Sequence, residues 1–110
     1  MHYCQIDHKV QNINHIDGVE VLESPLAWEK NKWIRQYLPE KPREGYFIWV
    51  KKQIDFPITA CVAIASPGVS QDLTNLFVLE RNISAKVNGV CNAIKDNLGG
   101  VHKARGKIVV

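Results

Sequence analysis

Three cysteines are the most reactive side chains of this 110-residue sequence, and they stand far apart, at Cys4, Cys61 and Cys91. A cysteine can bind iron or accept sulfur when its thiol ionises and can be reached. By composition alone, Cys91 is expected to be a buried thiol that packs as a small apolar group, and a reactive thiol is the alternative. Cys61 stands inside an apolar segment, where burial disfavours the thiolate, so we expect it in the core.

A histidine is the second candidate for the same chemistry. A cysteine and a histidine together can bind iron, and neighbouring strands lie ~4.8 Å apart, so His102 would approach Cys91 if their strands stack. The alternative is a histidine that is hydrogen-bonded at the start of a strand. His2, Cys4 and His8 crowd the N-terminal segment, but their spacing matches no zinc pattern, and we treat them as incidental.

The cysteine spacing, the charge and the N-terminal residues limit the class of protein. There is no CxxC pair and no dense cysteine framework of the secreted kind, so we expect reduced thiols. No signal peptide and no apolar run of membrane-spanning length are present, which predicts a cytoplasmic protein without membrane contact. Lys and Arg number 14 against 11 Asp and Glu without a run of like charge, so the net charge of +3 demands no anionic partner.

Neither catalysis nor nucleic-acid binding is indicated by the remaining motifs. There is no Gly-rich phosphate loop, no paired acidic motif and no nucleophile elbow, so we expect no enzyme activity from this chain. Lys103, Arg105 and Lys107 alternate along one strand face without stacking aromatic residues. We expect a solvated face there rather than a nucleic-acid contact.

The elements that must position Cys91 and His102 begin with residues 1–23, which we expect to be a polar, loosely attached leader. One possible short strand follows the turn residues Asp17 and Gly18, at residues 19–22.

Residues 24–44 are expected to form a helix and a linker. Ser24 stands at the N-cap and Pro25 at the first helical position, while Pro39 and Pro42 end the helix. Its apolar face, which we expect to pack over the first following strand, comprises Leu26, Trp33, Ile34, Tyr37 and Leu38.

Beyond Gly45 the apolar pattern takes a period of two, which is typical of strands. The alternation puts both Cys91 and His102 on an inward face. The pattern I-[ST]-A-x-V occurs at Ile58 and again at Ile83, a spacing that suits a β-solenoid, although an antiparallel meander or sandwich stays open. The expected strands are Tyr46–Val50, Pro57–Ala65, Leu73–Glu80, a strand from Ile83 to Ala93, and a final strand from Val101.

Five short motifs in a fixed order carry a resemblance to a known family. They are Phe47-Ile48-Trp49-Val50, the Pro57-Ile58 strand, Leu76-Phe77-Val78-Leu79-Glu80, Gly89-Val90-Cys91-Asn92-Ala93 and Val101-His102-Lys103-Ala104. In order and spacing they resemble the SufB/SufD family of iron-sulfur cluster assembly scaffolds. The resemblance covers about residues 45–110, and residues 24–38 resemble the helix that precedes the family's β-helix.

The resemblance implies a mainly β fold in which an N-terminal helix precedes a short right-handed parallel β-helix (solenoid) segment, the partial β-helix domain of residues 45–110. It implies a non-catalytic scaffold of the SUF system in which Cys91 and His102 handle the cluster or its sulfur. It implies no cofactor in this chain alone beyond a transient iron-sulfur cluster. The implied partners are a SufC-like ATPase or a SufB/SufD-like chain, and we expect the later coils of the family's scaffold to be missing.

A second function stays open beside the scaffold. A non-catalytic β-helix module could associate through the strand at residues 106–110, because an unpaired strand edge is a template for pairing. This alternative predicts a homo-oligomer joined through β-strand edges.

Overall fold

The computed structural model describes residues 3–64, 68, 70–93 and 101–109. These residues form eight strands, one α-helix and one 3-10 helix. In chain order they are β1 (Tyr3–Ile6), β2 (Lys9–Ile13), β3 (Val19–Glu23), α1 (Ser24–Lys30), η1 (Lys32–Gln36), β4 (Tyr46–Val50), β5 (Ile58–Ile64), β6 (Ser70–Leu79), β7 (Val87–Ala93) and β8 (Val101–Val109).

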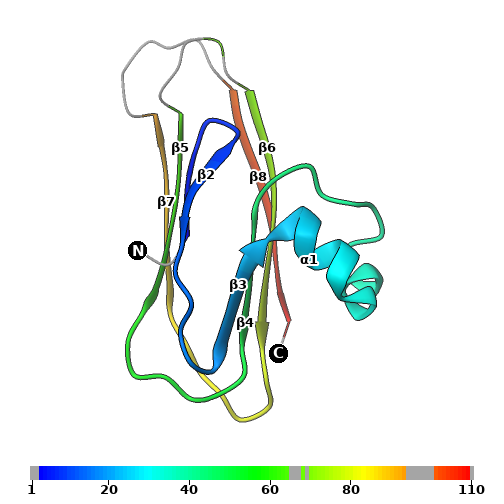
Figure 1. The fold of residues 1–110 in the computed structure, drawn as a ribbon, viewed down its shortest axis with the longest axis vertical. Helices are drawn as coiled ribbons and strands as arrows, with labels where there is room; N and C mark the ends of the chain where they lie inside the picture. The colour runs from blue at the N-terminus through cyan, green and yellow to red at the C-terminus, as the bar shows by residue number, and fades with distance from the viewer. Residues whose placement is uncertain (1–2, 65–67, 69, 94–100, 110) are drawn as a thin grey trace.

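The strands make two four-stranded sheets that face each other (Figure 1). Sheet A has the order β2-β1-β5-β7 and sheet B the order β3-β4-β6-β8. From β4 onward the chain alternates between the sheets, so β5 and β7 are parallel in one, and β4, β6 and β8 in the other. Helix α1 lies on the side of sheet B that faces away from sheet A (Figure 1).

The mainly β composition is confirmed, but the expected right-handed parallel β-helix is wrong. Both sheets are mixed and open, because β2 runs antiparallel to β1 and β3 antiparallel to β4. The repeated sequence pattern does not set the register either, since Ile58 pairs with Val87 and not with Ile83. Ile83 instead precedes β7 and packs, partly buried, against the core.

Residues 3–23 contribute strands to both sheets and are not a loosely attached leader. The strand expected at 19–22 is β3, while β1 and β2 arise where an irregular segment was expected. Strand β1 pairs in parallel with β5, and the Tyr3 side chain is fully buried. The polar residues of β1, such as the buried Gln5, conceal its alternating pattern in the sequence.

The expected helix is divided in two at Asn31, whose backbone is extended (φ −121°, ψ 98°). Pro25 lies in the first turn as predicted, but the N-cap is Glu23, and Ser24 is itself helical. Leu26 was expected on the packing face and is instead 48% exposed. Neither this helix nor η1 has the length and apolarity needed to cross a membrane, and these are the helices of the described residues.

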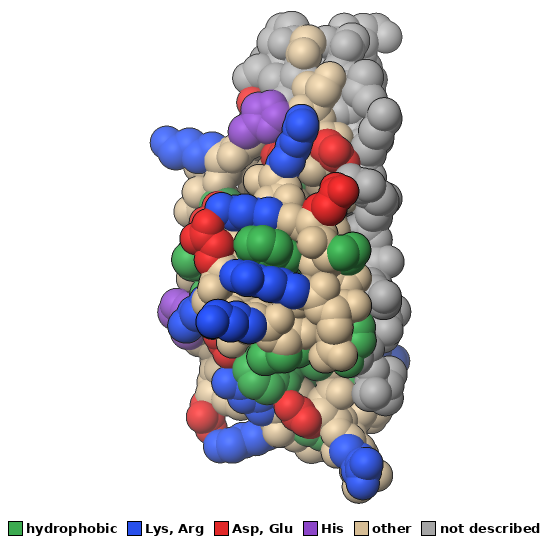
Figure 2. Space-filling model, turned by 90° about the vertical axis from the view of Figure 1, so that its right-hand side faces the viewer, with side chains coloured by type: hydrophobic (Ala, Val, Ile, Leu, Met, Phe, Trp, Pro, Cys, Tyr) green, Lys and Arg blue, Asp and Glu red, His purple; other side chains and the backbone are tan. Residues whose placement is uncertain are grey.

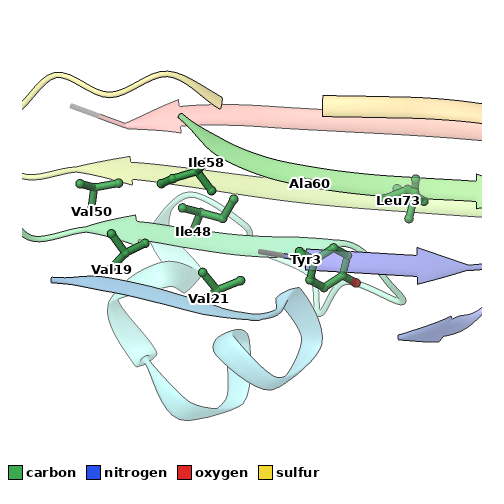
Figure 3. Packing of buried hydrophobic residues seen from close by; sticks show 9 residues of the cluster. Tyr3, Val19, Val21, Ile48, Val50, Ile58, Ala60 and Leu73 are labelled. Atoms are coloured by element: carbon green, nitrogen blue, oxygen red, sulfur yellow. The ribbon is translucent and has the colours of Figure 1, made fainter. Parts of the chain in front are cut away.

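Two apolar clusters hold the three layers together. Between the sheets, side chains of β1, β3, β4, β5 and β6 interdigitate (Figure 3); the buried members are Tyr3, Val19, Val21, Ile48, Val50, Ile58, Ala60, Val62 and Leu73. On the other face of sheet B, Ala27, Ile34 and Leu38 cover Phe47, Leu76 and Val78. The expected packing of helical aromatics on the first following strand is confirmed, with ring centroids 5.1 Å apart for Trp33 and Trp49.

Ile48 provides a test of the inter-sheet cluster, because its side chain is fully buried on the central strand β4. We expect Ile48→Ala to lower the free energy of unfolding by about 2–5 kcal/mol through lost burial and the cavity left behind. Leu26→Ala, at the exposed site on α1, should change it by less than about 0.5 kcal/mol. Urea denaturation of both variants measures the difference, and equal effects would contradict this assignment of the core.

Candidate functional site

A buried polar cluster joins the two sheets around one backbone oxygen. The carbonyl oxygen of Asp7 accepts a hydrogen bond from the side-chain amide of Gln5 at 3.0 Å and one from that of Gln71 at 2.6 Å. Gln5 belongs to β1 of sheet A and Gln71 to β6 of sheet B, and both side chains are buried. Asp7 presents its carbonyl from a left-handed turn (φ 57°) between β1 and β2. We call these three residues, with Tyr3 and Glu44, the glutamine cluster.

Tyr3 and Glu44 satisfy the remaining polar atoms of the Gln5 amide. The Tyr3 hydroxyl donates to Gln5 Oε1 at 2.7 Å, and Gln5 Nε2 donates to Glu44 Oε1 at 2.7 Å. Burial raises the pKa of the Tyr3 hydroxyl well above its ordinary value, with smaller contributions from the Glu23 and Glu44 carboxylates. The neutral hydroxyl is therefore the form that the folded protein holds between its sheets.

Glu44 connects the cluster to solvent and to sheet B. Its second carboxylate oxygen accepts the backbone N–H of Asp72 at 3.0 Å, and its first lies 3.1 Å from His8 Nδ1. The Glu44 side chain is 13% exposed and that of His8 is 62% exposed. Gly45 follows with a φ of 128°, where an added Cβ would collide with the Thr74 carbonyl. Because donors surround both carboxylate oxygens, Glu44 is a structural acceptor.

Cys91 occupies a register position on the same row as this cluster. In sheet A, Gln5 pairs with Val62, and Val62 pairs with Cys91 on the edge strand β7. The side chains of Gln5 and Val62 are both buried between the sheets. The register row that contains Cys91 therefore also contains the buried Gln5.

His102 occupies the matching position in the other sheet. It lies on β8 and pairs with Gln71 of β6. The strands of Cys91 and His102 do not stack as neighbours in one sheet, which was the condition under which the two residues were expected to approach each other, because β7 belongs to sheet A and β8 to sheet B. Their register rows nevertheless contain the two glutamines that bind the same carbonyl oxygen, Gln5 and Gln71. The two candidate residues thus stand on facing sheets, each on the last strand in the sheet order.

The other two cysteines meet in sheet A. Cys4 of β1 and Cys61 of β5 are register partners, and both are thiols of intermediate burial. Cys61 was expected in the core, but Ala60 and Val62 on either side of it take the buried positions. The sequence shows no sign of this pairing, because it depends on β1 adding in parallel to a strand that lies far along the chain.

Charges on the helix-bearing side of the molecule are mixed in sign, as Figure 2 shows. Glu20 lies 3.1 Å from Lys51 Nζ and 3.8 Å from Lys30 Nζ, and Lys41 pairs with Glu29. Within the parts of the chain that the structure describes, no group of three or more His, Cys, Asp or Glu side chains could hold a metal ion.

Comparison with models of known protein families finds no match, and comparison with curated proteins finds none either.

Replacing Tyr3 tests the polar cluster through its pH dependence. Because the folded-state pKa of Tyr3 is raised, its contribution to stability is complete below the ordinary tyrosine pKa of about 10 and is lost as the pH rises beyond it. The stability advantage of the native protein over Tyr3→Phe should shrink by about 1.4 kcal/mol between pH 9 and pH 11. Denaturation of both proteins at several pH values measures this change. A stability difference that stays constant over this range would show that the Tyr3 hydroxyl ionises in the folded protein as it does in the unfolded chain.

Proposed function

We propose that this protein takes part in iron-sulfur cluster assembly as a scaffold of the SufB/SufD type, working in the cytoplasm with a SufC-like ATPase. Cys91 and His102 are the residues to which we assign the handling of the cluster or of its sulfur. The proposal rests on the motifs around these residues and on their positions in the two sheets. It does not rest on a coiled solenoid, which the fold lacks.

One observation carries the proposal: the rows of Cys91 and His102 are tied to the same Asp7 carbonyl through two buried glutamines. An amide that is buried and hydrogen-bonded at both of its polar atoms resists displacement, because an unpaired buried group costs about 1–3 kcal/mol. These hydrogen bonds therefore oppose sliding of one sheet past the other at Gln5 and Gln71. A thiolate ligand and an imidazole ligand need such a fixed relationship to bind iron together.

The ligand count favours two chains around one cluster. A [2Fe–2S] cluster takes four protein ligands, and two histidines can replace two of the cysteines on one iron. One chain offers Cys91 and His102, so two chains supply the four ligands. Strands β7 and β8 lie last in their sheet orders among the described strands, which makes both of them edges at which a second chain can approach.

Anaerobic reconstitution with ferrous iron and sulfide tests the cluster role. We expect visible charge-transfer absorption from the native chain, and its loss in Cys91→Ser, because serine removes the thiolate ligand. Cys4→Ser/Cys61→Ser, which leaves Cys91 as the single cysteine, should keep the absorption. His102→Ala should weaken it, whereas His15→Ala, at an exposed site outside the cluster, should not. Undiminished absorption in Cys91→Ser would exclude the assigned role.

Size-exclusion chromatography of the same samples separates the scaffold from the simple interaction module. A cluster-bridged scaffold should become dimeric only after reconstitution and should return to monomer when a chelator removes the iron. An interaction module that pairs through its sheet edges would be dimeric before iron is added and would stay so in Cys91→Ser. A chain that remains monomeric in every sample, with or without absorption, would contradict the two-chain arrangement.

A further inference from the structure

Sheet A brings two cysteines into one register pair. Cys4 and Cys61 are Cα partners on β1 and β5, which are parallel neighbours in the interior of the sheet. The pairing of these two strands is continuous over the whole of β1, whereas the pairing of β1 with β2 shifts between Cys4 and Gln5. Two thiols therefore sit side by side, held by strands that cannot slide without disrupting the core.

Both cysteines lie on the face of sheet A that points away from sheet B. Successive residues of a strand point to opposite faces, and the neighbours of the two cysteines in β1 and β5 are buried in the inter-sheet core. The cysteines themselves are of intermediate burial. Helix α1 covers sheet B on the far side of the molecule and not this face (Figure 1). A small ion can reach the pair from solvent.

The strand spacing admits an ion bridged by two thiolates. Neighbouring strands lie ~4.8 Å apart, which is also within the Cα separation of about 4.4–6.8 Å that a disulfide allows. Zinc–thiolate bonds are about 2.3 Å long, so two metal–thiolate bonds of similar length span at most ~4.6 Å. Rotation of the two side chains can bring the sulfurs to that separation.

The number and type of ligands select the ion. Thiolates prefer soft cations such as Cu(I), while structural Zn²⁺ takes four ligands in a tetrahedron. No third His, Cys, Asp or Glu joins the pair among the residues that the structure describes. We propose that Cys4 and Cys61 form a two-thiolate site for a soft monovalent cation of the Cu(I) type. Binding releases one proton from each thiol to solvent and transfers no electrons.

This site is separate from the proposed cluster site. Cys61 pairs with Val90, and Cys91 pairs with Val62, so the two cysteines occupy adjacent register rows of the sheet. The Cu(I) site needs neither Cys91 nor His102. Failure of the iron-sulfur assignment would leave it intact.

Anaerobic titration of the full chain with Cu(I), in competition with a chromophoric Cu(I) chelator, tests the proposal. We expect the native protein and Cys91→Ser to take about one equivalent of Cu(I) from the chelator, with ultraviolet thiolate-to-copper absorption. Cys4→Ser and Cys61→Ser should each lose that equivalent. Circular dichroism checks that the variants fold, and X-ray absorption of the bound copper in the native protein should show two sulfur neighbours.

Several outcomes would overturn the proposal. One is that Cys4→Ser or Cys61→Ser still binds the equivalent of Cu(I), and another is that Cys91→Ser no longer binds it. A third is a copper environment with three sulfurs or with mainly nitrogen and oxygen. If the serine variants do not fold, the X-ray absorption measurement on the native protein decides alone.

Discussion

The carbonyl oxygen of Asp7 sets how the two sheets lie against each other. It accepts a hydrogen bond from a buried glutamine of each sheet, Gln5 and Gln71, and it is presented by a left-handed turn. Apolar contacts between sheets are non-directional and tolerate sliding, whereas a buried amide must keep its partner. Sliding one sheet past the other would break these bonds inside the core. The register rows that contain Cys91 and His102 include these two glutamines.

The sequence predicted the strands that follow Gly45 better than it predicted how they pair. The bounds of β4 match, because a run of aromatic and β-branched residues suits a strand strongly. Period-two alternation, however, reports the face of a residue and says nothing of its partner strand. The repeat of the I-[ST]-A-x-V pattern at Ile58 and Ile83 indicated a β-solenoid, while the observed pairing joins Ile58 to Val87.

The N-terminal strands and the site geometry could not be predicted from the sequence, because they too depend on which strands pair. Gln5 and Gln71 look like solvated residues in a sequence, and only their buried partners reveal that they belong to the core. Cys91 and His102 could be singled out as chemical types, but their assignment to facing sheets could not. The meeting of Cys4 with Cys61 depends on a long-range parallel pairing, for which no local signal exists.

The register of the strands therefore determines which cysteines of sheet A are neighbours. Cys61 stands opposite Val90, and Cys91 stands opposite Val62, one position further along both strands. A slip of one residue between β5 and β7 would make Cys91 the register partner of Cys61. The continuous pairing from Ile58 to Ile64, together with the buried side chains of Ile58, Ala60 and Val62, opposes that slip. The two thiol sites that we propose therefore occupy different register rows of one small sheet.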